Sequence, residues 1–103
     1  MKHLAISLAL ACTGALAASP ALAADPNLAR NLVANCANCH GTEGKAVQGT
    51  AMVPIAGTPK ELLVSKFKGY RSGALPATVM HQIAKGYTDE QIELIADYLA
   101  ARK

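Results

Sequence analysis

Two cysteines and a histidine share one short segment, Cys36-Ala37-Asn38-Cys39-His40. The spacing C-x-x-C-H is the attachment sequence for c-type haem. Thiols at this spacing form thioethers with the two vinyl groups on one edge of a porphyrin, and the histidine that follows presents its imidazole to the iron. The segment therefore predicts one covalently bound haem c, held by Cys36, Cys39 and His40.

Two other chemistries use a closely spaced cysteine pair. A thioredoxin-type dithiol or disulfide belongs in a βαβ setting, and this chain has no alternating strand pattern. A structural zinc site needs four ligands, and the chain has no second cysteine pair. Both alternatives fit the sequence less well than haem attachment does.

A haem iron has a sixth coordination position, and three side chains after His40 are candidates for it: Met52, Met80 and His81. Met52 follows His40 closely, in a loop that must first leave the histidine's side of the haem, whereas Met80 has chain enough to reach the opposite face. The side chains of the neighbours Met80 and His81 diverge, so we do not expect both to face the iron. Because methionine also serves as core filler, spacing alone leaves the choice open.

The N-terminal segment has the organisation of an export signal. A charged Lys2 is followed by an uncharged apolar run over residues 4–18, and Ala21-Leu22-Ala23 supplies the small residues that a signal peptidase accepts. The run is shorter than the roughly 20 residues that span a membrane. We interpret residues 1–23 as a cleaved signal peptide for export to the periplasm, and residues 24–103 as a single domain.

The rest of the chain has little bulk with which to build a core. The full sequence of 103 residues is 51% hydrophobic, but it holds only three tyrosines, one phenylalanine and no tryptophan. Domains this small often depend on a disulfide, a metal or a cofactor for stability, and a haem would supply the missing apolar surface.

The net charge of +3, with scattered basic residues, gives no reason to expect nucleic-acid binding. Cys12, the third cysteine, leaves with the signal peptide, and its surroundings match a lipid-attachment motif poorly.

The residue pattern predicts an all-α domain of short helices joined by irregular segments. Helices are expected from Asp25-Pro26 to the cysteines, over residues 60–70, over residues 78–85 before Gly86, and from Thr88 to the C-terminus. Gly, Thr and Pro dominate residues 41–59 and predict an irregular loop.

The last of these helices has the clearest signals. Thr88 and Gln91 form a capping-box pattern. The apolar residues that follow at helical spacing predict a buried stripe made of Ile92, Ile95, Ala96 and Leu99.

From about Asn31 to its C-terminus the chain resembles class I c-type cytochromes, which are small all-α proteins built around one haem. The resemblance rests on the opening Cys36–Gly41, on Pro54-Ile55-Ala56-Gly57, and on the closing pattern from Met80 to Leu99. Residues 24–103 would then form a cytochrome c domain. The narrower segment Met80-His81-Gln82-Ile83-Ala84-Lys85-Gly86-Tyr87 is similar to the cytochrome subunits of flavocytochrome c sulfide dehydrogenases.

The resemblance implies roles for three residues. Met80 would be the distal ligand of the iron. The carbonyl of Pro54 would accept the Nδ1–H of His40 and so set the ligating tautomer. Arg71 would place a cation near the haem propionates. Pro54 as a simple loop breaker and Arg71 as a solvated surface residue are equally open.

Histidine and methionine ligation would fill both axial positions and raise the reduction potential, which favours an electron relay over catalysis at the iron. We therefore expect one-electron transfer in the periplasm, with no catalysis by this chain itself. The chain would be either the cytochrome subunit of a sulfide-oxidising flavocytochrome c, paired with an FAD-containing subunit, or a free soluble carrier between redox proteins. Candidates for guiding an acidic partner are Lys45, Lys60, Lys66, Lys68 and Lys85.

Overall fold

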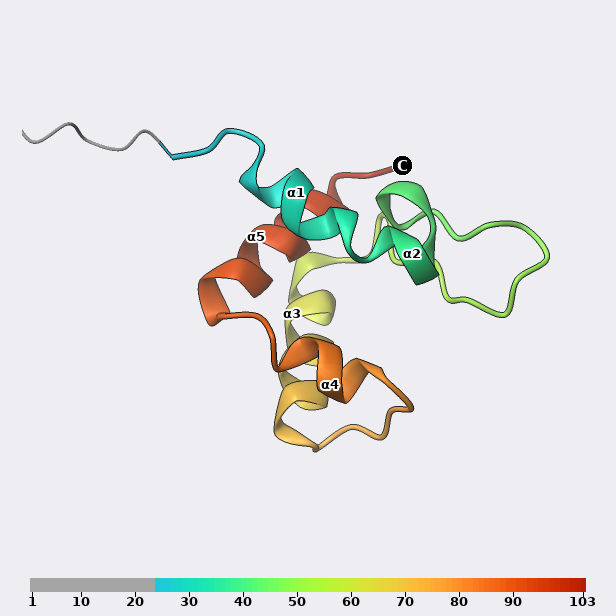
Figure 1. The fold of residues 1–103 in the computed structure, drawn as a ribbon, viewed down its shortest axis with the longest axis vertical. Coiled ribbons are helices and arrows are strands. Elements are labelled where there is room, and N and C mark those ends of the chain that lie inside the picture. Colours follow the sequence, from blue (N-terminus) through green and yellow to red (C-terminus); the bar gives the residue numbers. More distant parts are fainter. Residues whose placement is uncertain (1–23) are drawn as a thin grey trace, which may run out of the picture.

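Short helices make up the described part of the chain, residues 24–103 of a computed structural model (Figure 1). In chain order they are α1 (Leu28–Ala34), α2 (Ala37–His40), the 3₁₀ turn η1 (Thr42–Gly44), α3 (Lys60–Ser72), α4 (Met80–Ala84) and α5 (Asp89–Ala100). Residues 24–103 contain no strand, and the all-α prediction is confirmed. The predicted signal peptide, residues 1–23, lies outside the described residues. None of the helices just named is long and apolar enough to cross a membrane.

Helix α1 begins at Leu28, later than the predicted start at Asp25-Pro26. The carboxylate of Asp25 accepts the backbone N–H of Asn27 at 2.8 Å, and its backbone carbonyl accepts the N–H of Leu28 at 3.1 Å. Asp25 therefore closes a tight turn through Pro26 before the helix begins. Cys36 is the N-cap residue of the separate short helix α2, and Cys39 lies within that helix.

Helix α3 runs two residues past Tyr70, where the sequence pattern placed its end, and stops at Ser72. Gly69 lies inside the helix, and the side chain of Leu75 packs so closely over it that a Cβ at this glycine would lie 2.7 Å from Leu75 Cδ1. The residue that ends the helix is Gly73, whose left-handed φ of 81° suits glycine.

Helix α5 forms as its sequence predicts. The hydroxyl of Thr88 accepts the N–H of Gln91 at 3.2 Å, and the side-chain oxygen of Gln91 accepts the N–H of Thr88 at 3.0 Å, so both halves of the capping box are made. The four residues of its predicted stripe are buried. The helix packs against α1 and α3, and α4 packs against α3 (Figure 1).

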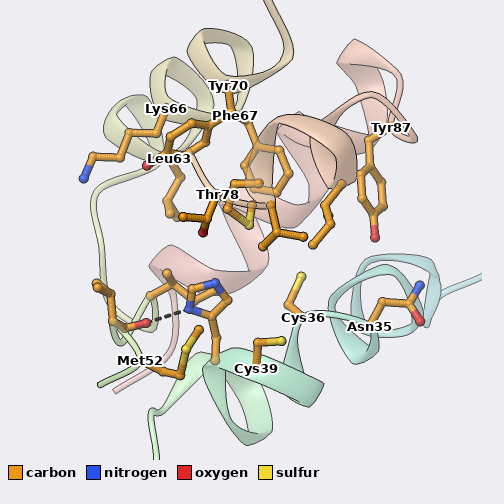
Figure 2. Close-up of a pocket in the computed structure, with 16 residues that line it drawn as sticks. Asn35, Cys36, Cys39, Met52, Leu63, Lys66, Phe67, Tyr70, Thr78 and Tyr87 are labelled. Carbon is orange, nitrogen blue, oxygen red and sulfur yellow. Dashed lines mark hydrogen bonds between the residues drawn. The ribbon is translucent and has the colours of Figure 1, made fainter. Parts of the chain in front are cut away.

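The buried core is small and lies where these helices meet. It consists of one residue of α1, two of α3, one of α4 and four of α5: Val33, Leu63, Phe67, Ala84, Ile92, Ile95, Ala96 and Leu99. The segment between η1 and α3, residues 45–59, is irregular, as predicted. It borders a cavity that two of these core residues, Leu63 and Phe67, also line (Figure 2).

Candidate haem-binding site

A cavity of about 310 Å³ lies among α2, the loop before α3, α3 itself and the segment that leads into α4. Its walls are mostly apolar and include Ile55, Leu63, Phe67, Ile83 and Tyr87. Phe67 and Tyr87 stack edge to face, with ring centroids 6.1 Å apart. An apolar cavity with a few convergent polar groups is the usual form of a cofactor site.

The two cysteines approach this cavity from α2. Cys36 is half-buried, Cys39 is exposed, and both thiols are free. The N–H groups of Cys39 and His40 both donate to the carbonyl of Cys36, at 3.2 and 2.9 Å, so one helical turn carries all three side chains to the same wall. Burial raises the pKa of the Cys36 thiol, only partly offset by a backbone hydrogen bond.

His40 is oriented by a short hydrogen bond. Its Nδ1–H donates to the backbone carbonyl of Val53 at 2.6 Å, drawn as the dashed line in Figure 2. Because a carbonyl oxygen only accepts, this bond places the proton on Nδ1 and leaves Nε2 with a lone pair for a metal.

The acceptor is not Pro54, so the role predicted for the Pro54 carbonyl is wrong. That carbonyl shares a trans peptide with the N–H of Ile55, which donates to the carbonyl of Gly44 at 2.9 Å. In a trans peptide the C=O and N–H point in opposite directions. The Pro54 oxygen therefore points away from Gly44, and the preceding carbonyl faces the imidazole.

Met80 and Met52 both line the cavity, but they approach it from different segments. Met52 is 40% exposed and lies beside Cys39 on the wall that α2 forms (Figure 2). Met80 is the first residue of α4, and Thr78, just before it, lies on the opposite wall, next to Leu63 (Figure 2). Met52 and the segment that leads into Met80 thus lie on different walls of the cavity.

The side chain of His81 is not among those that line the cavity. It is half-buried, and its Nδ1 is buried without a hydrogen-bond partner. The prediction that neighbouring Met80 and His81 do not both face the same site agrees with this arrangement.

Arg71, for which the resemblance implies a cation near the propionates, is not among the residues that line the cavity. Its guanidinium donates to the carbonyl of Tyr87 at 3.2 Å and forms an ion pair with Asp89. The hydrogen bond that Arg71 donates to the Asp89 carboxylate, reinforced by the charges of Arg71 and Lys68, holds the pKa of Asp89 below its usual value. Arg71 thus ties the end of α3 to the start of α5.

The cation that does line the cavity is Lys66. Sequence reasoning grouped it with four other lysines and did not place it at the site. Its helical spacing could have indicated this position in the sequence. Lys66 follows Leu63 by three residues and adjoins Phe67, so it lies on the helix face that lines the cavity. The loop residue Val53 was also missed, because no sequence signal shows which carbonyl meets an imidazole.

The donors gathered here suit a covalently attached haem. Two thiols on one helical turn, an imidazole with a free Nε2 and a thioether on the opposite wall surround a largely apolar cavity. Thiolate, imidazole and thioether are the side chains that attach and ligate haem c. Within residues 24–103, no three His, Cys, Asp or Glu side chains cluster in a way that could hold a metal ion on their own.

This fold and this set of donors define a small all-α c-type haem protein. A model of the cytochrome c family matches residues 27–103, and the chain belongs to that family. Its cofactor is covalently bound haem c.

Three curated relatives show the range of similar proteins. The chain is 40% identical over 68 residues to the cytochrome subunit of sulfide dehydrogenase from Chlorobaculum tepidum, a match that covers 65% of this chain and 59% of that one. It is 33% identical over 73 residues to cytochrome c-553 from Nitratidesulfovibrio vulgaris, covering 67% and 71%. It is 30% identical over 71 residues to the thiosulfate dehydrogenase electron acceptor of Stutzerimonas stutzeri, covering 66% and 32%. The chain thus spans less than two thirds of the sulfide dehydrogenase subunit.

Proposed function

We propose that the chain is a periplasmic one-electron carrier in which Cys36 and Cys39 attach haem c and His40 and Met80 are its axial ligands. The observation that carries the proposal is the convergence of these four side chains, which come from two separate segments, on one apolar cavity. Bound haem c supplies a one-electron Fe(III)/Fe(II) couple.

Each residue has a distinct task in this proposal. The thiols of Cys36 and Cys39 hold the cofactor covalently, so a small domain retains it without a deep pocket. His40, held by the carbonyl of Val53, keeps its Nδ1 protonated and offers Nε2. Met80 offers a thioether, which favours ferrous iron and raises the potential. Aromatic and aliphatic walls keep water away from the site.

Met80 is preferred to Met52 because of the walls they occupy. If His40 holds the iron from one wall of the cavity, a second protein ligand would come from the facing wall. Met52 lies beside Cys39, on the same wall as the histidine, whereas the segment that carries Met80 forms the facing wall (Figure 2). The same separation makes Met52 the matched control for a substitution of Met80.

The ligand assignment is tested in the holoprotein. The Met80→Ala variant should lose the weak sulfur-to-iron charge-transfer band of the ferric form, lower the reduction potential, and open the iron to cyanide or carbon monoxide. Met52→Leu and His81→Ala should keep the band. Loss of the band in Met52→Leu, with its retention in Met80→Ala, would reverse the assignment.

Attachment through both cysteines is tested by mass and by electrophoresis. When the chain is expressed with export and haem-attachment machinery, the mature protein should have the mass of residues 24–103 plus one haem. Cys36→Ala and Cys39→Ala should each reduce covalent haem in denaturing gels. Haem that survives denaturation with neither cysteine present would refute this part of the proposal, and a lipid-sized excess on Cys12 would refute cleavage after residue 23.

The physiological assembly has two candidates. Similarity to a cytochrome subunit of sulfide dehydrogenase supports a permanent subunit that takes electrons from an FAD-containing sulfide-oxidising chain. The match to cytochrome c-553 covers more of both proteins, and that name specifies no larger complex, which leaves a free carrier as the second candidate. Size exclusion of the native protein separates them. A subunit should co-elute with a flavin-bearing chain, whereas a carrier should elute as a small monomer.

Two of the five lysines proposed to guide an acidic partner lie close to carboxylates of this chain. Lys60 pairs with Glu93 at 3.1 Å and with Asp97 at 2.9 Å, and Lys68 lies 3.9 Å from Asp89, so carboxylates offset both charges. Lys66 lines the cavity, next to the place where electrons would leave.

We therefore expect Lys66→Glu to slow electron transfer to an acidic redox protein at low ionic strength, where charge steering is strongest. Lys60→Glu should slow it less. Equal effects of the two substitutions would show that steering does not depend on Lys66.

A further inference from the structure

The C-terminal turn of α5 holds the segment that follows His40. Glu43, in η1, accepts a hydrogen bond from the hydroxyl of Tyr98 at 2.8 Å. Arg102 lies 3.7 Å from the same carboxylate, places its guanidinium 4.0 Å above the Tyr98 ring and donates to the Tyr98 carbonyl at 3.1 Å. Glu43 is also the one non-glycine residue in the described chain with a positive φ, 55°. Side-chain contacts to α5 thus hold a turn that residues other than glycine and asparagine rarely adopt.

The same turn of α5 also holds the segment that follows Val53. The carbonyl of Leu99 accepts the N–H of Gly57 at 2.8 Å. The carbonyl of Gly44, next to Glu43, accepts the N–H groups of Ile55 and Ala56 at 2.9 and 3.0 Å. The end of α5, η1 and residues 55–57 therefore form one hydrogen-bonded unit.

This unit lies next to both partners of the hydrogen bond that orients the proximal histidine. His40 precedes Glu43 by three residues, and Val53 precedes Ile55 by two. A displacement of η1 relative to residues 55–57 would therefore change the separation of His40 Nδ1 and the Val53 carbonyl, now 2.6 Å.

We propose that Glu43, Tyr98 and Arg102, here named the α5 clamp, are positioning residues that keep the His40–Val53 hydrogen bond short and thereby help to set the reduction potential. The proposal rests on the proposed function in one respect, which is that His40 ligates the iron. None of the three clamp residues lines the cavity, so they act through His40 and not by contact with the cofactor.

The charges within the α5 clamp suit a geometric role. The hydrogen bond from Tyr98 and the nearby cation of Arg102 lower the pKa of Glu43, so its carboxylate stays ionised at neutral pH. The same hydrogen bond raises the pKa of Tyr98, so its hydroxyl keeps the proton that it donates. Arg30 and Lys45 are the other cations whose charge acts on Glu43. The donor and acceptor roles therefore do not change near neutrality.

The direction of the effect follows from the chemistry of a ligating imidazole. A hydrogen bond from the second ring nitrogen to a carbonyl makes the ligand more basic, and a more basic ligand stabilises ferric iron. A loosened clamp should lengthen this bond, weaken the ligand's basicity and raise the reduction potential.

Two substitutions in the holoprotein separate position from charge. Tyr98→Phe removes the donor and leaves the Glu43 carboxylate in place, whereas Glu43→Gln removes the charge and keeps an oxygen that can accept from Tyr98. We expect Tyr98→Phe to raise the reduction potential. We also expect it to increase the rate of solvent exchange of the His40 Nδ1–H severalfold, as measured by proton NMR. Glu43→Gln should leave the exchange rate nearly unchanged.

A purely electrostatic role predicts the opposite sign for Tyr98→Phe. A carboxylate without its hydroxyl partner is a stronger negative charge, which would leave the potential unchanged or lower it. Either result, or an exchange rate equal to that of the unmodified protein, would overturn the proposal. If Tyr98→Phe does not fold, Glu43→Ala removes the acceptor instead and should give the same faster exchange, and its failure to do so would be equally decisive.

Failure of the proposed function gives a different result. If His40 is not an iron ligand, the unmodified ferric protein will show no strongly shifted resonance for its ring, and His40→Ala will keep the visible spectrum of the haem. In the clamp variants the visible spectrum should stay that of a six-coordinate haem, since neither substitution removes a proposed ligand.

Discussion

Gly41, the residue directly after His40, has a backbone conformation that a side chain would disrupt. Its φ of 83° and ψ of 163° lie in a region that is essentially confined to glycine, where another residue costs about 1–3 kcal/mol. A Cβ there would lie 2.8 Å from the carbonyl carbon of Lys45 and closer still to its oxygen. Relieving such an overlap typically costs another 1–3 kcal/mol, roughly. Gly41→Ala should therefore lower the free energy of unfolding by about 4 kcal/mol, a large part of the stability of a domain this small.

Gly73 serves as the control, because its φ of 81° is also positive, its ψ of 5° places it in the ordinary left-handed region, and no atom lies within 4 Å of a Cβ built there. Gly73→Ala should lose only the cost of a left-handed alanine, about 1–2 kcal/mol. Any gain from stiffening the unfolded chain is shared by both variants and cancels in the comparison.

Guanidinium denaturation of the holoproteins, followed by far-UV circular dichroism, measures both losses. Gly41→Ala should also yield less holoprotein, because the overlap can be relieved only by moving the backbone next to His40. If Gly41→Ala costs no more than Gly73→Ala, the close approach of Lys45 to this turn does not constrain the protein and the reasoning fails.

Three further predictions concern α5. Leu99→Ala should lower the free energy of unfolding by about 2–5 kcal/mol, because Leu99 is fully buried. Leu94→Ala, at a residue that is 37% exposed, should cost much less in the same denaturation assay, and equal losses would contradict the assigned core. Thr88→Ala removes the capping hydroxyl and should cost about 0.5–2 kcal/mol, whereas an unchanged midpoint would mean that the cap does not stabilise α5. The ion pair with Arg71 lowers the pKa of Asp89, so its contribution is present above the ordinary pKa, near 3.8, and is lost as the pH falls below it. Thermal midpoints of Asp89→Asn should accordingly fall less than those of the unmodified protein on acidification, and parallel profiles would refute a stabilising role for the pair.

The features that the sequence predicted correctly are those that depend on neighbouring residues. The C-x-x-C-H segment identifies haem attachment because three side chains on one helical turn must lie together wherever the turn is placed. Helix α5 was predicted in detail because its capping box and its apolar stripe are both local patterns. The same reasoning placed α1 too early, because Asp25 could cap either a helix or a turn and only the folded chain selects one.

The contacts between distant segments needed the tertiary structure. Which carbonyl meets His40 depends on the direction of one peptide plane, and that plane is set by a hydrogen bond between Ile55 and Gly44. Arg71 could have reached either the cofactor or an acidic helix start, and packing of α3 against α5 brought Asp89 within its range. The sequence by itself determined the chemistry of the site, because that chemistry is local. The tertiary structure decided which backbone groups orient it, because those groups meet only after distant segments pack together.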